Sequence, residues 1–170
     1  MNTPPLEIER KYVILIPDLE HLCAVDGYTV SKITQTYLIS PSHITHRVRR
    51  REYPDRVVYT ETKKIRIDKI SVYEDERELT ESEYLALIKS ADPALTPIIK
   101  VRHTVPVCDV VAEIDIYPNW KHTCIMETEL PSREHAVTFP PYIRIVKEVT
   151  GEKQYSNASM SRSFPPEIDP

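Results

Sequence analysis

Charged side chains recur at every second position along several β-like segments of this 170-residue sequence. Because alternate residues of a β-strand face the same side, this spacing gathers charges on one face of each segment. Acidic side chains share a face in four segments: Glu7 with Glu9, Glu74 with Glu76 and Glu78, Asp109 with Glu113 and Asp115, and Glu127 with Glu129. Basic side chains share a face in two segments: Arg47 with Arg49 and Arg51, and Lys100 with Arg102.

These two kinds of cluster require ligands of opposite charge. Clustered Arg and Lys repel one another unless an anion joins them, and the guanidinium fork matches phosphate oxygens. Clustered carboxylates repel likewise unless a cation lies between them, and ligands that are all oxygen suit Mg²⁺, Mn²⁺ or Ca²⁺. A polyphosphate with a divalent ion satisfies both clusters, which is the electrostatic arrangement for phosphoryl transfer.

The elements that position these side chains are expected to be mostly β-strands. Period-2 alternation predicts eight of them, at residues 6–15, 33–40, 44–52, 56–64, 71–79, 97–105, 109–117 and 123–130. Thr80 and Glu83 form a capping box before a helical apolar stripe, and shorter helices are expected within 17–25 and 132–136 and after Tyr155. Charges on one face and apolar residues on the other predict an α+β, mainly β fold. We expect an eight-stranded antiparallel closed β-barrel, a tunnel with a polar interior and a few covering helices.

The composition excludes several classes of site. Two glycines are too few for a P-loop or a dinucleotide-binding loop, so side chains must hold any phosphate. A net charge of −4 gives no general attraction to nucleic acid or membrane, and neither partner is expected. The three scattered cysteines and the absence of a signal sequence or membrane span predict a cytoplasmic protein with reduced thiols. The length suits one domain over 1–170, as a monomer or homodimer, and the Pro-rich tail SFPPEIDP is expected to be loose.

Several motifs in a fixed order resemble a known family. They are EIERK at 7–11, Arg47-Val48-Arg49, the lysine of TETKK, Lys100-Val101-Arg102, EID at 113–115, ETE at 127–129 and the ending VTGEKQYSNASM. Together they resemble the CYTH superfamily, the triphosphate tunnel metalloenzymes, over roughly residues 6–162. The family includes class IV adenylate cyclases, thiamine triphosphatases and short bacterial tripolyphosphatases, and its fold is an eight-stranded antiparallel tunnel.

The resemblance implies a role for each matching residue. It implies four metal carboxylates, Glu7, Glu9, Glu127 and Glu129. It implies seven cations that bind the triphosphate, Lys11, Arg47, Arg49, Lys63, Lys100, Arg102 and Lys153. It also implies acidic supporting residues, Asp115, Glu76 and Glu78, with Asp115 orienting an arginine, and it places Tyr37 beside the lysine of the fourth strand.

The expected activity is metal-dependent hydrolysis of a linear triphosphate, and inorganic tripolyphosphate is the leading candidate substrate. Mg²⁺ or Mn²⁺ on the carboxylates would position a water for in-line attack on the terminal phosphate, and the cations would stabilise the departing diphosphate. Two candidates for the general base are a carboxylate near the metal, such as Glu9, and a Lys63–Tyr37 pair with a lowered pKa. Alternatives are an adenylate cyclase, a thiamine triphosphatase and a non-catalytic module that binds triphosphate or polyphosphate.

Overall fold

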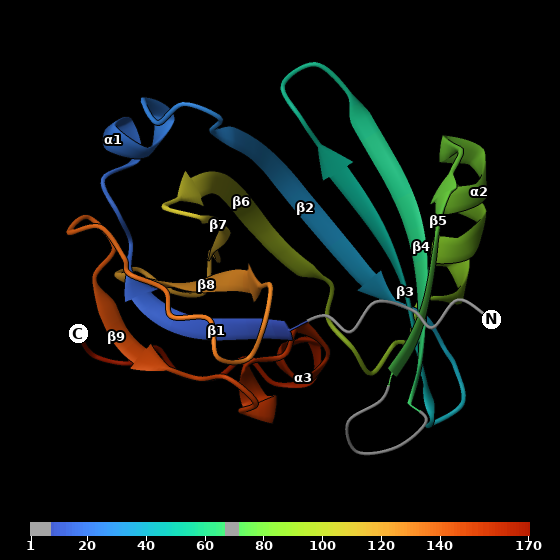
Figure 1. Cartoon of the computed structure of the whole chain (residues 1–170). Coiled ribbons are helices and arrows are strands. Elements are labelled where there is room, and N and C mark those ends of the chain that lie inside the picture. The colour runs from blue at the N-terminus through green and yellow to red at the C-terminus, as the bar shows by residue number, and fades with distance from the viewer. Residues whose placement is uncertain (1–7, 67–71) are drawn as a thin grey trace. The chain divides into compact units, whose positions relative to one another are not determined.

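A computed structural model describes residues 8–66 and 72–170 of the chain. Within them it shows nine β-strands and three short α-helices (Figure 1). The strands are β1 (Ile8–Leu15), β2 (Thr29–Tyr37), β3 (Ile44–Glu52), β4 (Val57–Arg66), β5 (Val72–Leu79), β6 (Ile98–Val107), β7 (Val110–Ile116), β8 (Thr123–Leu130) and β9 (Ile145–Glu148). The helices are α1 (Leu19–Cys23), α2 (Glu81–Leu87) and α3 (Asn157–Arg162), and two 3-10 turns are η1 (Ile88–Ser90) and η2 (Lys153–Tyr155).

The expected fold class is confirmed, since the protein is mainly β with antiparallel strands and a few short helices. Two expected strands, 44–52 and 123–130, have the predicted bounds. The ninth strand, β9, was not expected. The helix predicted over 132–136 is wrong: that segment follows Pro131 and makes one turn, closed by a hydrogen bond from the His135 N–H to the Ser132 carbonyl.

The described residues form two compact units. The first contains 32–66, 72–99 and 156–164, and the second contains 8–31, 100–155 and 165–170. The strands follow the order β5-β4-β3-β2 in the first unit and β6-β7-β8-β1-β9 in the second. Among the described strands of each unit the last does not pair with the first, so hydrogen bonds close no barrel within a unit.

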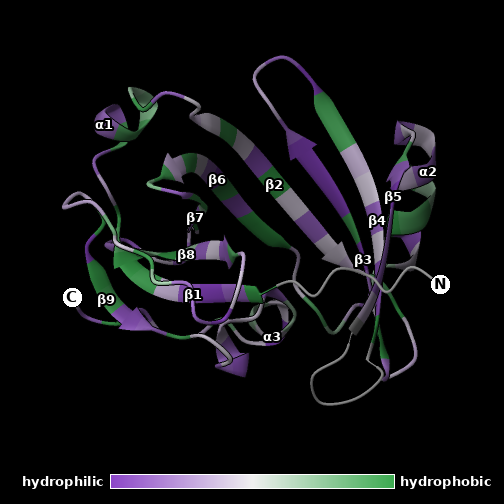
Figure 2. Cartoon of the chain, viewed as in Figure 1, coloured by the Kyte–Doolittle hydropathy of each residue, from purple (hydrophilic) through white to green (hydrophobic). Residues whose placement is uncertain are grey.

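Helix α2 covers one face of the first unit. Thr80 and Glu83 form the predicted capping box at its start, which satisfies backbone N–H groups that the first helical turn leaves without partners. Tyr84 of α2 then packs on Tyr59 of β4, with ring centroids 4.8 Å apart, and joins Leu38, Val48 and Leu79 in the core. The opposite face of β2–β5 is left for polar side chains, and Figure 2 shows β3 as largely hydrophilic.

The core of the second unit lies on one face of β6, β7, β8 and β1. Its buried members include Val105, Ala112, Ile114, Met126 and Ile14. Leu22 of α1 and the segment around Ile143 cover this face. Alternate residues of the same strands therefore carry their side chains to the other face, where the predicted charged residues lie.

The C-terminal tail is docked, so the expectation of a loose tail is wrong. The Glu167 carboxylate accepts hydrogen bonds from the backbone N–H groups of Lys121, His122 and Thr123. Pairing of this kind holds a segment that has no regular secondary structure of its own. No helix in the described ranges is long and apolar enough to cross a membrane.

Candidate functional site

Strand pairing gathers the charged residues of the second unit on one face. Arg102 lies opposite Asp115, Glu113 opposite Glu127, and Glu127 opposite Lys11. Directly opposite residues of antiparallel strands point to the same side, so four strands contribute to one charged surface. Glu9 and Glu129 lie opposite each other on the same face, one pair further along β1 and β8.

Asp115 is the buried centre of this surface. Its side chain is fully buried and accepts a hydrogen bond from Lys100 Nζ at 2.6 Å. Arg102 donates to both carboxylate oxygens, each at 2.7 Å, in a bidentate pair. The expected role of Asp115, orienting an arginine, thus agrees with the geometry, and the carboxylate orients a lysine as well.

The single Asp115 carboxylate pairs with two buried cations, and this sharing shifts the pKa values of the groups. Burial opposes the ionised form of Asp115, but Lys100 and Arg102 outweigh it and lower the pKa of Asp115 to about 2. Arg102 occupies both oxygens, so the charge of Lys100 is less well compensated. Complete burial therefore lowers the pKa of Lys100 to about 8. A further anion near Lys100 would stabilise its charged form.

Glu127 and Glu9 form a second group on this face. Glu127 accepts from Lys11 Nζ at 2.8 Å and lies 3.6 Å from Arg102. Although burial acts against it, Lys11 and Lys100 lower the pKa of Glu127. Glu9 keeps an exposed edge, yet its crowded surroundings and the neighbouring Glu127 carboxylate raise the pKa of Glu9 above its ordinary value. The two adjacent carboxylates repel each other, so one of them resists ionisation. A cation between them would relieve this repulsion.

The other predicted residues of this unit differ in exposure and in contacts. Glu129 is exposed, and Lys153 is exposed in η2. Glu113 bonds Arg102 but had been assigned no role in binding. Glu7 lies outside the described residues. Within the described ranges, no group of three or more His, Cys, Asp or Glu side chains is arranged to hold a metal ion.

The first unit presents a second charged face. Arg49 lies opposite Gln35 and Thr60, and Arg47 lies opposite Tyr37 and Thr62. The Arg47 Nε and the Thr60 hydroxyl are buried and have no hydrogen-bond partner within the described part of the chain. Buried donors without partners are costly, so this face is suited to a ligand that accepts hydrogen bonds.

Gln35 is a site residue that the sequence analysis missed. It is fully buried, its Oε1 accepts from Arg49 at 3.2 Å, and its Nε2 donates to the Tyr37 hydroxyl at 2.7 Å. It thereby orients Arg49. The sequence feature that could have identified Gln35 is its position in the strand expected over 33–40, where this polar residue shares a face with Ile33 and Tyr37.

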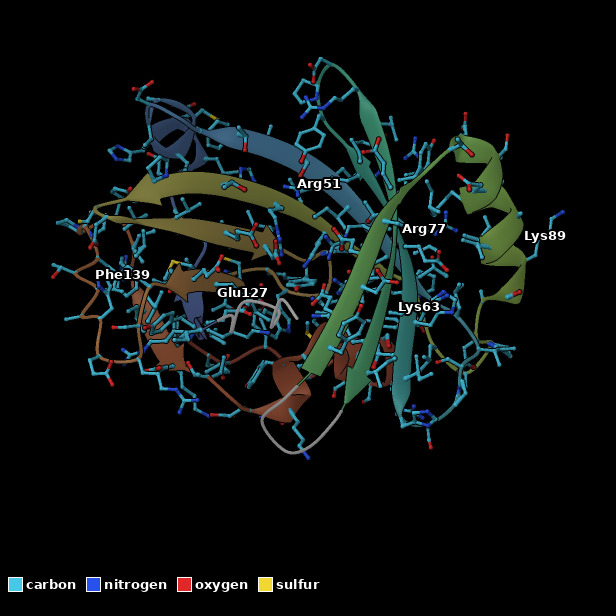
Figure 3. All side chains as sticks on the ribbon, turned by 45° about the vertical axis from the view of Figure 1, so that its right-hand side comes forward. Arg51, Lys63, Arg77, Lys89, Glu127 and Phe139 are labelled. Carbon is cyan, nitrogen blue, oxygen red and sulfur yellow. The ribbon has the colours of Figure 1, made fainter. Side chains whose placement is uncertain are left out.

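The two adjacent lysines of TETKK lie on opposite faces of β4. Lys64 shares the face of Arg47 and pairs with Glu74 at 2.8 Å. Lys63, the residue chosen from the sequence, lies opposite His46 on the α2 side of the unit and is 3.7 Å from Glu61. Glu61 also pairs with Arg77, and Figure 3 labels Lys63 and Arg77 on the neighbouring strands β4 and β5.

The expected Lys63–Tyr37 pair is therefore not formed. Tyr37 points to the Arg47 face, whereas Lys63 points to the other face, and burial raises the pKa of Tyr37 instead of lowering it. The two predicted carboxylates of β5 lie on the Arg47 face: Glu76 accepts from the Thr62 hydroxyl at 2.8 Å, and Glu78 lies opposite Thr60.

Comparison with known proteins identifies the fold. No family model and no curated protein matches the sequence. Among solved structures, that of the inorganic triphosphatase NE1496 aligns with a TM-score of 0.63 at 24% identity, covering 98% of this chain and 99% of that chain. A second structure, of the hypothetical protein NE1496, aligns with a TM-score of 0.60 at 23% identity over 94% and 99% of the two chains. The PH1819 protein from Pyrococcus horikoshii OT3 aligns with a TM-score of 0.52 at 17% identity over 74% and 80%.

These alignments show that this chain has the fold of the inorganic triphosphatase structure over nearly its whole length. The antiparallel, mainly β fold expected from the sequence agrees with these structures.

Proposed function

We propose that this chain hydrolyses a linear triphosphate in a reaction that depends on Mg²⁺ or Mn²⁺. Inorganic tripolyphosphate is the leading candidate substrate. The observation that carries the proposal is the charged face of the second unit. There the cations Lys11, Lys100 and Arg102 adjoin the carboxylate pair of Glu9 and Glu127. The inorganic triphosphatase NE1496, whose structure has the same fold, supports this activity.

We propose that the carboxylates of this face would gather around a divalent cation once it binds. The mutual repulsion of Glu9 and Glu127 would be relieved by an ion with oxygen ligands, and Glu129 lies opposite Glu9 on the same face. We assign Glu9, Glu127 and Glu129 as ligands, together with Glu7 from the sequence motif. When bound, the ion would act as a Lewis acid on phosphoryl oxygens and lower the pKa of a bound water.

The cations of the second unit would stabilise charge on the phosphates. Lys11 has two acceptors, the Glu127 carboxylate and the Tyr155 carbonyl, and an ammonium has three N–H donors, so one remains for a phosphate oxygen. Asp115 holds Lys100 and Arg102 in fixed positions. Preorganised donors of this kind act on the charge of the departing diphosphate at little reorganisation cost.

The first unit offers a separate set of phosphate-binding groups. Arg47, Arg49 and Lys64 share one face, and Gln35 orients Arg49. The Arg47 Nε and Thr60 hydroxyl, which have no partner among the described residues, are donors that phosphate oxygens would satisfy. We therefore propose that Lys64, and not Lys63, is the lysine of β4 that binds the triphosphate.

The two lysines provide a matched pair of variants. Lys64→Ala should raise the KM for tripolyphosphate roughly tenfold, because a charge-assisted contact to phosphate is lost. Lys63→Ala should leave KM within about twofold, because this side chain is half-exposed on the other face of β4. Steady-state kinetics of both variants decide the assignment. A rise in KM for Lys63→Ala alone would return the role to Lys63.

The pKa of Lys100 predicts how binding depends on pH. Because burial lowers this pKa to about 8, the ammonium is present below pH 8 and is lost as the pH rises through that value. The affinity for tripolyphosphate should therefore fall about tenfold between pH 7 and pH 9, as measured by calorimetry without metal. Lys100→Met, which cannot titrate, should show a much flatter profile with the same ligand. Parallel profiles for the two proteins would exclude Lys100 as the titrating group.

A substrate comparison tests the proposal directly. The protein would be incubated with tripolyphosphate, ATP or thiamine triphosphate in the presence of Mg²⁺ or Mn²⁺, and phosphate, pyrophosphate and cyclic AMP would be measured. Release of phosphate that is fastest from tripolyphosphate and lost with EDTA is the expected result. Pyrophosphate together with cyclic AMP would identify a cyclase, and binding without turnover would identify a triphosphate-binding module.

A further inference from the structure

Trp120 is the sole tryptophan of the chain and is nearly completely buried, with 4% of its surface exposed. It lies between β7 and β8 in the second unit. Its ring packs edge-on against two tyrosines, Tyr117 at 6.2 Å and Tyr155 at 6.3 Å between centroids. Contacts of this geometry are favourable for aromatic rings, so Trp120 fixes the places of both tyrosines.

Each of these tyrosines contacts a lysine of the charged face. The Tyr117 ring lies 5.8 Å from Lys100 Nζ, within the range of a cation–π interaction. The Tyr155 carbonyl accepts a hydrogen bond from Lys11 Nζ at 3.3 Å. Lys11 is on β1 and Lys100 is on β6, and these strands are not neighbours in the strand order of the unit. Trp120 therefore links the surroundings of two lysines from separate strands.

The C-terminal tail holds Trp120 in place. Its indole N–H donates to the Pro165 carbonyl at 3.0 Å. Two residues further on, Glu167 accepts from the N–H groups of Lys121, His122 and Thr123 and from the Thr123 hydroxyl, at 2.6 to 3.0 Å. These bonds lower the pKa of Glu167 to about 2, so the carboxylate is ionised near neutral pH. We call the Pro165 carbonyl and the Glu167 carboxylate the tail clasp.

We propose that Trp120, held by the tail clasp, is a positioning residue that sets Lys11 and Lys100 for phosphate binding. The inference rests on the proposed function, because it assumes that these lysines bind the triphosphate. Neither Trp120 nor Glu167 is proposed to contact the substrate. Both act through the tyrosines, and small displacements of binding groups are enough to weaken a site.

The fluorescence of Trp120 reports on the clasp independently of activity. Glu167→Ala removes the acceptor of three backbone N–H groups, so the tail should detach and the emission of Trp120 should shift to longer wavelength as water reaches the ring. Glu167→Gln keeps one acceptor oxygen without the charge and should give a smaller shift. Both spectra are recorded on the full chain.

Kinetics with tripolyphosphate and Mg²⁺ then separate positioning from general stability. Glu167→Ala and Trp120→Leu should raise KM roughly fivefold with kcat nearly unchanged. Trp120→Phe keeps aromatic packing but loses the bond to Pro165, and should fall between these variants and the wild type. The matched control is Phe139→Leu, since Phe139 packs edge-on against Tyr12 at 5.3 Å on the core side of β1 (Figure 3 labels Phe139). That variant should lower the melting temperature and leave KM unchanged.

The outcomes are distinct. A red shift in Glu167→Ala with an unchanged KM would overturn the positioning role and leave the clasp as a purely structural device. An equal rise in KM for Phe139→Leu would also overturn it, because KM would then follow stability alone. If the wild-type protein neither binds nor hydrolyses tripolyphosphate, the proposed function fails, and the role of Trp120 fails with it. A rise in KM confined to the Trp120 and Glu167 variants supports the inference.

Discussion

Replacing Glu127 by Gln should lower the rate of tripolyphosphate hydrolysis at least about a hundredfold. Gln has nearly the same shape, but it cannot supply the negative charge that the proposed divalent cation beside Glu9 would require. It also leaves Lys11 without its carboxylate partner at 2.8 Å. The rate would be measured as phosphate release with saturating Mg²⁺, and the affinity for Mn²⁺ would be measured separately.

Glu148→Gln provides the matched control for this change. Glu148 is an exposed carboxylate on β9 of the same unit, and its pairing with Arg10 at 4.0 Å is weak. Its replacement should change neither the rate nor the affinity for Mn²⁺. If Glu127→Gln retains the wild-type rate and binds Mn²⁺ as tightly, Glu127 is not a metal ligand.

Replacing Asp115 by Asn should cause the largest loss of stability among single changes at the site. Asp115 is fully buried and is hydrogen-bonded to Lys100 and Arg102. Its loss removes the carboxylate that pairs with buried Lys100 and leaves Arg102 with only Glu113 and Glu127. Breaking a buried pair in this way costs about 3–5 kcal/mol. Urea unfolding at pH 7 measures the difference, and Asp26→Asn, at an exposed carboxylate of the same unit, should be nearly neutral.

The pH dependence of this difference has a definite sign. The pKa of Asp115 is depressed to about 2 in the folded protein, so its contribution to stability is complete above the ordinary pKa near 4 and is lost as the pH falls toward 2. The unfolding free energies of the wild type and Asp115→Asn should therefore converge over that window. A difference that stays constant from pH 5 to pH 2 would show that the charge of Asp115 is not the source of its contribution.

The charged faces could be predicted from the sequence because alternation is a direct property of a strand. Lys100, Arg102 and Asp115 share a face on β6 and β7 as their spacing required. The expected Lys63–Tyr37 pair failed because β4 carries charged residues on both faces, so alternation alone does not place Lys63. The short turn at Pro54 and Asp55, closed by a bond between the Tyr53 N–H and the Arg56 carbonyl, sets the register with β3. Counting pairs outward from that turn places Lys64, and not Lys63, on the face of Arg47 and Arg49.

The tail clasp and Gln35 could not be predicted in the same way. The contacts of Glu167 with residues 121–123 join segments more than forty positions apart, with separations of 44 to 46 residues. The alternation of polar and apolar residues within a strand does not indicate contacts between segments so far apart. The role of Gln35 depends on its neighbours Arg49 and Tyr37, and a single polar residue in a strand does not indicate which partners it will meet.

The pairing of β1 with β8 has a consequence for synthesis of the chain. Ile8 pairs with Leu130 and Leu15 with Thr123, so β1 must wait for β8 until residues 123–130 have left the ribosome. At the usual rate of translation, that delay is on the order of ten seconds. During it, Val13 and Ile14, which are fully buried in the finished protein, have no partner strand, whereas the strands of the first unit emerge consecutively and can already pair. We expect nascent chains stopped before β8 to bind chaperones through β1.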